Sequence, residues 1–176
     1  MLSTLPLDLI SALVRQRWLL PVLARFHGQP GLRFAELLGR LGLPRDSLVR
    51  VLELAQAQGW IARNPGHGHP LRPEYILTEE GQGAARAAAE LAARMEAAGL
   101  APADLTRWSL PALRAIALGS ERFNDLIRGL SPASPRALSQ TLRALVANDL
   151  VVREVEDGFP PSSRYRLTAR GQALAS

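Results

Sequence analysis

The chain contains one pattern twice. The residues from Tyr75 read YILTEEGQ, and those from Tyr165, 90 positions later, read YRLTARGQ. The segment RWLLPVL from Arg17 returns as RWSLPAL from Arg107 with the same separation. Solenoid repeats have periods of about 20 to 50 residues, so this period is too long for a solenoid and long enough for a small domain with its own core. We therefore expect a tandem duplication whose two copies share one fold.

Apolar residues in each copy follow helical spacing first and form short strand-like runs afterwards. In the first copy, this pattern predicts one or two helices over residues 6–27 and one helix each over 34–41 and 44–58. It also predicts strands over 60–62 and 75–77 and a Gly- and Pro-rich turn over 64–70. The second copy repeats the order, with helices over 108–118, 123–129 and 134–148, strands over 150–152 and 165–167, and a turn over 157–162.

Three helices followed by a hairpin are the order of a winged helix-turn-helix. The expected fold class is mainly α with small β wings (α+β), built as two tandem winged helix-turn-helix domains joined by a helix. The Ala-rich stretch from Glu79 to Ala98 has no internal Pro and predicts the joining helix. The expected layout is winged-helix domain 1 over residues 1–78, a connecting helix over 79–100 and winged-helix domain 2 over 101–176.

The amino-acid composition of the chain limits the classes of partner that it is expected to bind. The formal net charge is +5 and every basic residue is Arg, which suits an acidic partner such as nucleic acid. A GC-rich genome would produce a similar composition, so composition alone does not indicate a site. The absence of Cys excludes disulfides and thiolate metal sites. Without an apolar run of about 18 residues or a basic secretory start, we expect cytoplasmic residence and no membrane partner.

Several motifs occur in order in the second copy: Trp108, RFNDL from Arg122, SPRALSQTLRAL from Ser134 and YRLTARG from Tyr165. The first copy keeps most of them, although its third helix has diverged. In this combination the chain resembles the HxlR-type winged-helix transcriptional regulators. The resemblance implies binding to double-stranded DNA. Family members usually carry one such domain and pair as homodimers, so two fused copies imply a covalent pseudo-dimer and leave a further homodimer open. Many members sense signals through a Cys that this chain lacks, so the small-molecule effector stays unknown.

A winged helix-turn-helix places its third helix in the major groove and its wing over the backbone. With the leucines of the second copy's third helix directed to the core, its Arg and Gln side chains face outward, where Arg can read guanine and Gln can read adenine. The candidate DNA-binding residues of the second copy are Arg136, Ser139, Gln140, Arg143, Arg164 and Arg166. Those of the first copy are Arg45, Arg50, Arg63 and Arg72.

The two copies are unequal in these positions. The third helix of the first copy also presents Asp46 and Glu53, and Glu53 stands where the second copy has Arg143. A carboxylate near phosphates is unfavourable, so the first copy is expected to recognise DNA sequence less well than the second. The second wing carries acidic residues beside its arginines, among them Glu154 and Glu156.

Two other classes of function, a protein-binding adaptor and an enzyme, can be compared with the sequence. A tandem winged-helix adaptor that binds protein, for example in chromosome organisation, would explain the modest charge and the acidic wing. An enzyme is not expected, because the chain offers no Cys, no carboxylate pair and no phosphate-binding loop, and no cofactor is expected either. His67 and His69 lack a third ligand, so a wing tip that touches phosphate is preferred over a metal site. Trp18 and Trp108 are expected to be core anchors.

Overall fold

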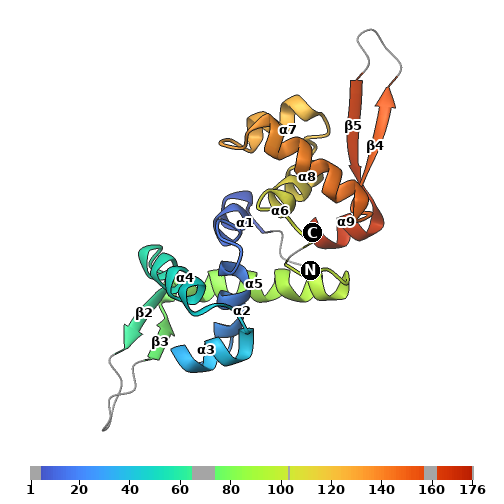
Figure 1. The fold of residues 1–176 in the computed structure, drawn as a ribbon. Coiled ribbons are helices and arrows are strands. Elements are labelled where there is room, and N and C mark those ends of the chain that lie inside the picture. Colours follow the sequence, from blue (N-terminus) through green and yellow to red (C-terminus); the bar gives the residue numbers. More distant parts are fainter. Residues whose placement is uncertain (1–4, 65–73, 103, 157–161, 176) are drawn as a thin grey trace. The chain divides into compact units, whose positions relative to one another are not determined.

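The computed structural model describes residues 5–64, 74–102, 104–156 and 162–175, and the chain divides into two compact units (Figure 1). The first unit lies within residues 15–93. The second unit combines residues 94–175 with residues 5–14 from the start of the chain. Contacts therefore group residues 5–14 with the second repeat. The layout of 1–78, 79–100 and 101–176 stays a prediction of where one sequence copy ends and the next begins.

The first unit is a three-helix arrangement with a wing. Its helices α2 (Leu19–Phe26), α3 (Phe34–Leu41) and α4 (Arg45–Ala57) contact one another. Its strands β1 (Leu32–Arg33), β2 (Ile61–Asn64) and β3 (Glu74–Leu77) form an antiparallel sheet in the order β1–β3–β2. Helix α5 (Glu79–Ala97) follows the wing as one continuous helix, as its Ala-rich sequence predicts.

The second unit repeats these elements around a central helix. Its members are α1 (Leu7–Leu13), α6 (Ser109–Ala117), α7 (Phe123–Gly129), α8 (Pro135–Ala147), β4 (Val151–Glu156), β5 (Ser162–Leu167) and α9 (Ala169–Ala175). Helix α6 contacts α1, α7, α8, α9 and β5, and its residues from Ser109 to Ile116 are buried. Buried Arg114 donates from Nε to the carbonyl oxygen of Leu5, 3.0 Å away, which ties the segment before α1 to α6.

Each unit has its own apolar core, so the predicted fold class is confirmed. In α4 the fully buried side chains are Leu48, Val51 and Leu52, and in α8 they include Leu138, Leu142 and Leu145. Burial of one such side chain contributes about 1.5 to 3 kcal/mol, so these apolar faces hold the third helix of each unit in place and leave its opposite face to solvent. The wing strands extend beyond the short apolar runs: β4 continues through the consecutive exposed residues Val152 to Val155 and stays paired with β5 as far as Glu156.

The repeated Y-x-L-T-x-x-G motif has a physical explanation in the first unit. The hydroxyl of Thr78 donates to the carbonyl oxygen of Gly59, and the backbone N–H of Gly81 donates to the same hydroxyl at 3.0 Å. A Cβ at Gly81 would lie 1.8 Å from the carbonyl oxygen of Trp60, a distance that no side chain can occupy. The motif therefore joins the end of α4, the wing and the start of α5 at a corner where only glycine fits.

The second unit builds the same corner with the equivalent residues. The Thr168 hydroxyl donates to the carbonyl oxygen of Asp149 at 2.7 Å, and the N–H of Gly171 donates to that hydroxyl. A Cβ at Gly171 would lie 1.9 Å from the carbonyl oxygen of Leu150. The duplication thus preserved a structural corner in both copies, and this requirement accounts for the strongest sequence match between them.

The two repeated tryptophans differ from the sequence expectation. Trp18 and Trp108 are half-buried N-cap residues that precede α2 and α6, so they are not core anchors. Helical periodicity does not fix the direction of a side chain at the cap, which explains the error. The guanidinium carbon of the preceding residue, Arg17 or Arg107, instead lies 5.0 Å from the centroid of each tryptophan ring.

Candidate nucleic-acid interface

Helix α8 presents an exposed basic and polar stripe. Ser134 caps its start by accepting the N–H of Ala137 at 3.2 Å, and Pro135 occupies the first turn. Residues three, four and seven positions apart share a helix face, and the stripe contains exposed Arg136, Gln140 and Arg143 with half-buried Ser139 between them. Arg143 donates from Nε to the carbonyl oxygen of Ser139 at 3.2 Å, so its side chain folds back along this stripe.

The buried side of α8 fixes the direction of that stripe. Thr141 is 1% exposed, and its hydroxyl lies 2.7 Å from the hydroxyl of Thr106, which itself lies 3.1 Å from the hydroxyl of Ser109 at the start of α6. This polar contact adds a directional restraint to the leucine packing. Helix α8 contains no acidic residue between Pro135 and Ala147, so its outer face is uniformly suited to phosphates and base edges.

Helix α4 presents a mixed face. Arg45 and Arg50 are exposed as predicted, but Asp46 and Glu53 are exposed on the same helix. The guanidinium of Arg45 lies 5.0 Å from the ring centroid of Phe34, which holds it against the start of α3. The structure describes no side-chain cap at Pro44, in contrast to Ser134 on α8. The exposed face of α4 is therefore less basic than that of α8, and the N-terminus of α4 lacks the side-chain cap that α8 has.

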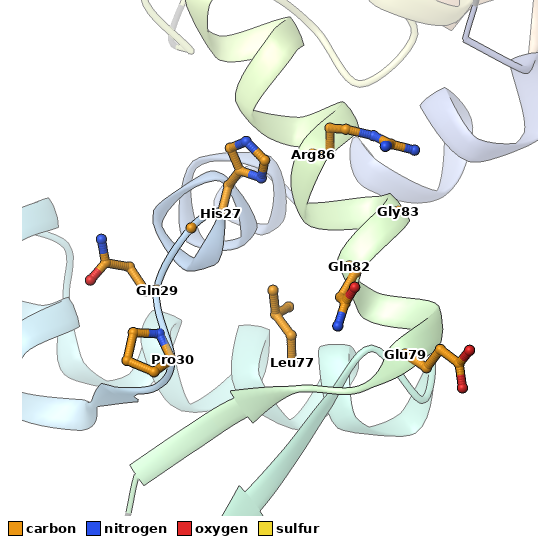
Figure 2. Close-up of a pocket in the computed structure, with 9 residues that line it drawn as sticks. His27, Gln29, Pro30, Leu77, Glu79, Gln82, Gly83 and Arg86 are labelled. Atoms are coloured by element: carbon orange, nitrogen blue, oxygen red, sulfur yellow. The ribbon is translucent and has the colours of Figure 1, made fainter.

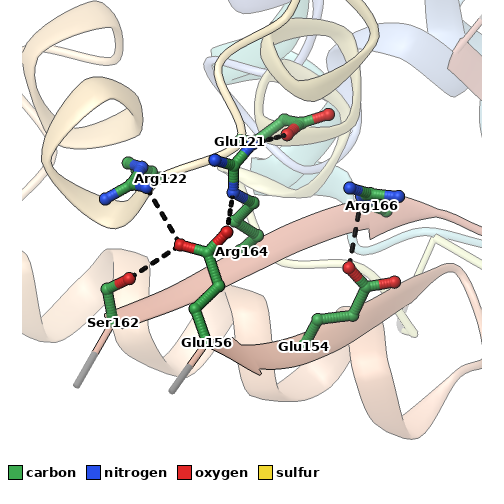
Figure 3. Close-up of polar contacts among 7 residues, drawn as sticks. All are labelled: Glu121, Arg122, Glu154, Glu156, Ser162, Arg164 and Arg166. Carbon is green, nitrogen blue, oxygen red and sulfur yellow. Dashed lines mark hydrogen bonds and ion pairs between the residues drawn. The ribbon is translucent and has the colours of Figure 1, made fainter. Parts of the chain in front are cut away.

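Arginines of the second wing are engaged with acids. Arg164 lies between Glu121, with an Nη1–Oε2 distance of 3.2 Å, and Glu156, which it contacts through Nε (Figure 3). Arg122 Nη2 lies 2.9 Å from Glu156 Oε2, and on the same strands Arg166 lies 3.3 Å from Glu154. We call these six residues (Glu121, Arg122, Glu154, Glu156, Arg164 and Arg166) the wing lattice. It places both predicted wing arginines beside carboxylates.

Protonation of the lattice follows from these contacts. The Ser162 hydroxyl donates to Glu156 Oε2 at 2.9 Å and, with Arg164 and Arg122, holds the pKa of Glu156 below its ordinary value. Hydrogen bonds to Glu121 and Glu156 raise the pKa of Arg164 further above its ordinary value. A carboxyl whose pKa is lowered by folding stabilises the fold above its unfolded pKa and loses that contribution as pH falls through its folded pKa. The ion pairs of Glu156 are thus intact at neutral pH and weaken in acid.

Sequence reasoning missed Glu121 and Arg122 as members of this cluster. It registered the acidic wing, but Glu121 and Arg164 are far apart in sequence, and only the strand register brings them together. The N–H of Tyr165 donates to the carbonyl oxygen of Glu121 at 2.8 Å, and Arg122 bridges to Arg164 as a short extension of the sheet. The first unit has a strand, β1, immediately before Phe34, but the sequence pattern predicted no strand at this position in either copy.

The first wing carries Arg63, which is exposed on β2. Arg72, His67 and His69 lie outside the described residues, so their predicted roles stay predictions. Within the described part of the chain, no group of three or more His, Cys, Asp or Glu side chains could hold a metal ion. The same residues include no helix that is long and apolar enough to cross a membrane.

The first unit also contains an open hollow of about 620 Å³ (Figure 2). It lies among the loop after α2, the end of β3 and the first turns of α5, and its lining includes His27, Gln29, Leu77, Gln82 and Arg86. Its lining side chains from the loop after α2 and from α5 are exposed. In Figure 2 the charged ends of Glu79 and Arg86 point away from His27 and Gln29 on the facing loop, so the polar groups do not converge on one ligand position.

Comparison with known proteins gives these elements a family. The HxlR-like helix-turn-helix family matches residues 13–99 and again residues 105–176. Similar curated proteins are the uncharacterized HTH-type transcriptional regulators YtfH of Escherichia coli, with 33% identity over 70 residues (40% of this chain, 56% of the relative), and YvaP of Bacillus subtilis, with 35% over 69 residues (39% and 64%). One from Methanothermobacter thermautotrophicus is 32% identical over 68 residues (39% and 52%).

The chain thus spans about half to two thirds of the length of these relatives. Among solved structures, a MarR-family transcriptional regulator from Enterococcus faecalis V583 aligns with a TM-score of 0.39 and 27% identity, covering 48% of this chain and 71% of that one. The two family matches together include both third helices, α4 and α8, and most of the chain. The chain therefore belongs to the HxlR-like helix-turn-helix family of transcriptional regulators.

Proposed function

We propose that the chain regulates transcription as a covalent pseudo-dimer whose two winged-helix units bind adjacent half-sites on double-stranded DNA, with α4 and α8 in the major groove. The observation that carries the proposal is the acid-free stripe of Arg136, Ser139, Gln140 and Arg143 on α8. Arg and Gln offer bidentate hydrogen bonds to guanine and adenine edges, so this stripe can discriminate between bases. The proposal assigns no catalytic step and no cofactor to the chain.

The two units have unequal roles in this proposal. Helix α8 supplies most of the base discrimination, since Asp46 and Glu53 weaken the electrostatic attraction of α4 to phosphates. The first wing contributes Arg63, and the second wing contributes Arg164 and Arg166 only to the extent that their carboxylate partners release them. Pairing of two complete chains would add a second copy of this asymmetric arrangement.

The target is expected to be asymmetric, because the two recognition helices differ where bases would be read. By the repeat alignment, Gln140 replaces Arg50 and Arg143 replaces Glu53. Sequences selected by the full chain from a random duplex pool should contain two unlike half-sites about one helical turn apart, roughly 34 Å. Footprinting combined with the mass of the complex gives the number of chains for each site. A symmetric footprint from a single chain would contradict this assignment.

Salt dependence provides a second test. Binding held by Arg–phosphate contacts loses affinity linearly in log salt, with a slope of about −0.9 for each phosphate neutralised. Two recognition helices and two wings predict a slope of roughly −4 to −8 on the selected duplex. Fluorescence anisotropy titrations over a series of salt concentrations would measure it, with a scrambled duplex of equal length as the control.

A tandem winged-helix adaptor that binds protein is the second candidate. The observation that favours it is the wing lattice, which neutralises three arginines of the second unit. An adaptor of this kind would show a salt slope near zero on every duplex and would select no common sequence from the random pool. The two experiments above therefore separate the two candidates.

A further inference from the structure

The wing lattice lies where a winged helix-turn-helix approaches the DNA backbone. Arg122 is the N-cap residue of α7, and Arg164 and Arg166 lie on β5 of the wing. These elements flank the recognition helix and would lie near the phosphates under the proposed function. The three arginines are matched by three carboxylates, so the lattice carries no net charge although it contains half of the second unit's candidate DNA-binding arginines.

Glu156 occupies the centre of this cluster. One carboxylate oxygen meets Arg122 and Ser162, each at 2.9 Å, and the other meets Arg164 (Figure 3). Arg164 also contacts Glu121. Removal of Glu156 would therefore leave Arg164 with Glu121 as its carboxylate partner and would remove the ion pair between Arg122 and Glu156. Glu156 is thus the single group whose charge holds two cations.

The contacts around Glu156 are partly open to solvent. Arg122 is 48% exposed, and Arg164 and Glu156 are each 35% exposed. Ion pairs at such exposure are weak and are screened by salt, so a phosphate can compete for the same guanidinium groups. The lattice therefore lowers the affinity of these arginines for phosphate without removing it.

The first copy does not repeat the arrangement. Around the second helix the separation of the copies is 89 residues, since Phe34 aligns with Phe123. Arg33 therefore corresponds to Arg122, but buried Leu32 stands in place of Glu121, and Glu74 stands in place of Arg164. The sequence position equivalent to Glu156 is Gly66. The lattice belongs to the second unit alone, the same unit whose recognition helix carries the acid-free reading face.

We propose that Glu156 is an intramolecular competitor for DNA phosphate that restrains Arg122 and Arg164 and so lowers the affinity of the second unit for every duplex. Phosphate contacts carry no sequence information, whereas base contacts do. A carboxylate that weakens the phosphate contacts lowers binding to every duplex and leaves the contribution of α8 unchanged. The ratio of specific to non-specific affinity stays the same, because both affinities fall by the same factor. This inference rests on the proposed DNA-binding function.

The test uses the full chain with Glu156→Gln. Glutamine keeps an oxygen for the Ser162 hydroxyl and removes the charge. Affinity for a scrambled duplex should rise about two- to tenfold, and the salt slope should steepen by about one to two, one increment of about 0.9 for each guanidinium released. The affinity for the selected duplex should rise by the same factor, so the ratio between selected and scrambled duplexes should stay near that of wild type. Glu96→Gln, an exposed position on α5 in the same unit, makes the same change in net charge and should leave the slope and ratio near wild type.

A double variant identifies the groups responsible. Arg164→Ala combined with Glu156→Gln should return a large part of the added scrambled-duplex affinity. Thermal melting followed by circular dichroism shows whether each variant is folded. If Glu156→Gln leaves scrambled-duplex binding unchanged or weakens it while wild type binds its selected sequence, the competitor role is overturned and the DNA-binding function stands. If wild type binds no duplex even at low salt, both are overturned, and that result is visible before any variant is made.

Discussion

Replacement of Gly81 by alanine is expected to lower the free energy of unfolding of the first unit by on the order of 3 kcal/mol or more. The added Cβ would lie 1.8 Å from the carbonyl oxygen and 2.7 Å from the carbonyl carbon of Trp60. Both atoms belong to the backbone, so the contact cannot be relieved by rotation of a side chain. The turn between α4 and β2 would have to separate from α5, and the hydrogen bonds of Thr78 would be strained with it.

A matched control lies two residues away on the same helix. A Cβ at Gly83 would meet no atom within 4 Å, so Gly83→Ala should stabilise α5 by about 0.5 to 1 kcal/mol through helix propensity. Hydrogen exchange of peptides from each unit would assign the effect to the first unit, and Gly171→Ala should act in the same way on the second. Equal stability of Gly81→Ala and Gly83→Ala would show that the corner does not require glycine.

Arg143→Ala is expected to weaken binding to the selected duplex by about 1 to 3 kcal/mol, roughly a 5- to 150-fold rise in Kd, and to relax preference at one base position. Arg143 lies exposed on the α8 stripe with no acidic residue on its helix, so its guanidinium can commit to a base edge. Repeated selection from the random pool with the variant would identify the base position that it reads.

The equivalent test on the first unit uses Arg50→Ala. This change should cost less, because exposed Asp46 and Glu53 on α4 already oppose the approach of phosphates. Both variants remove one positive charge from an exposed helix face, so they control for each other in net charge. A larger loss for Arg50→Ala, or an equal loss on selected and scrambled duplexes for Arg143→Ala, would contradict the ranking of the two recognition helices.

Much of the fold could be predicted from the sequence because the duplication presents the same order of helices and strands twice. The third helix of each copy was predicted within a few residues, since buried leucines such as Leu138 and Leu142 mark one face and a Pro marks the start. The wing strands were predicted too short. Their outer residues are mostly polar, exposed on β4 and half-buried on β5, so apolar runs indicate only the inner half of each strand.

The candidate site could be predicted only in part. Exposure of Arg136, Gln140 and Arg143 follows from helical periodicity, which is a local property. The engagement of Arg164 by Glu121 depends on a strand register and on the path of the loop before α7, neither of which is local. Charge composition of the wing suggested weaker phosphate binding, but it could not identify which carboxylate holds which guanidinium.

The packing of residues 5–14 on α6 has a consequence for synthesis of the chain. The first unit is an uninterrupted segment and can fold as soon as residues 15–93 have been made, whereas α1 has to wait for its partner helix, which ends at Ala117. At about 5 to 20 residues per second, the ribosome needs roughly 5 to 20 s to make the intervening hundred residues. During that interval, Ile10 and Leu13, both buried in the finished protein, have no α6 to cover them. In nascent chains, other apolar surfaces can therefore bind α1 before α6 has been made. A gene divided between the two repeats would yield a second winged helix without α1.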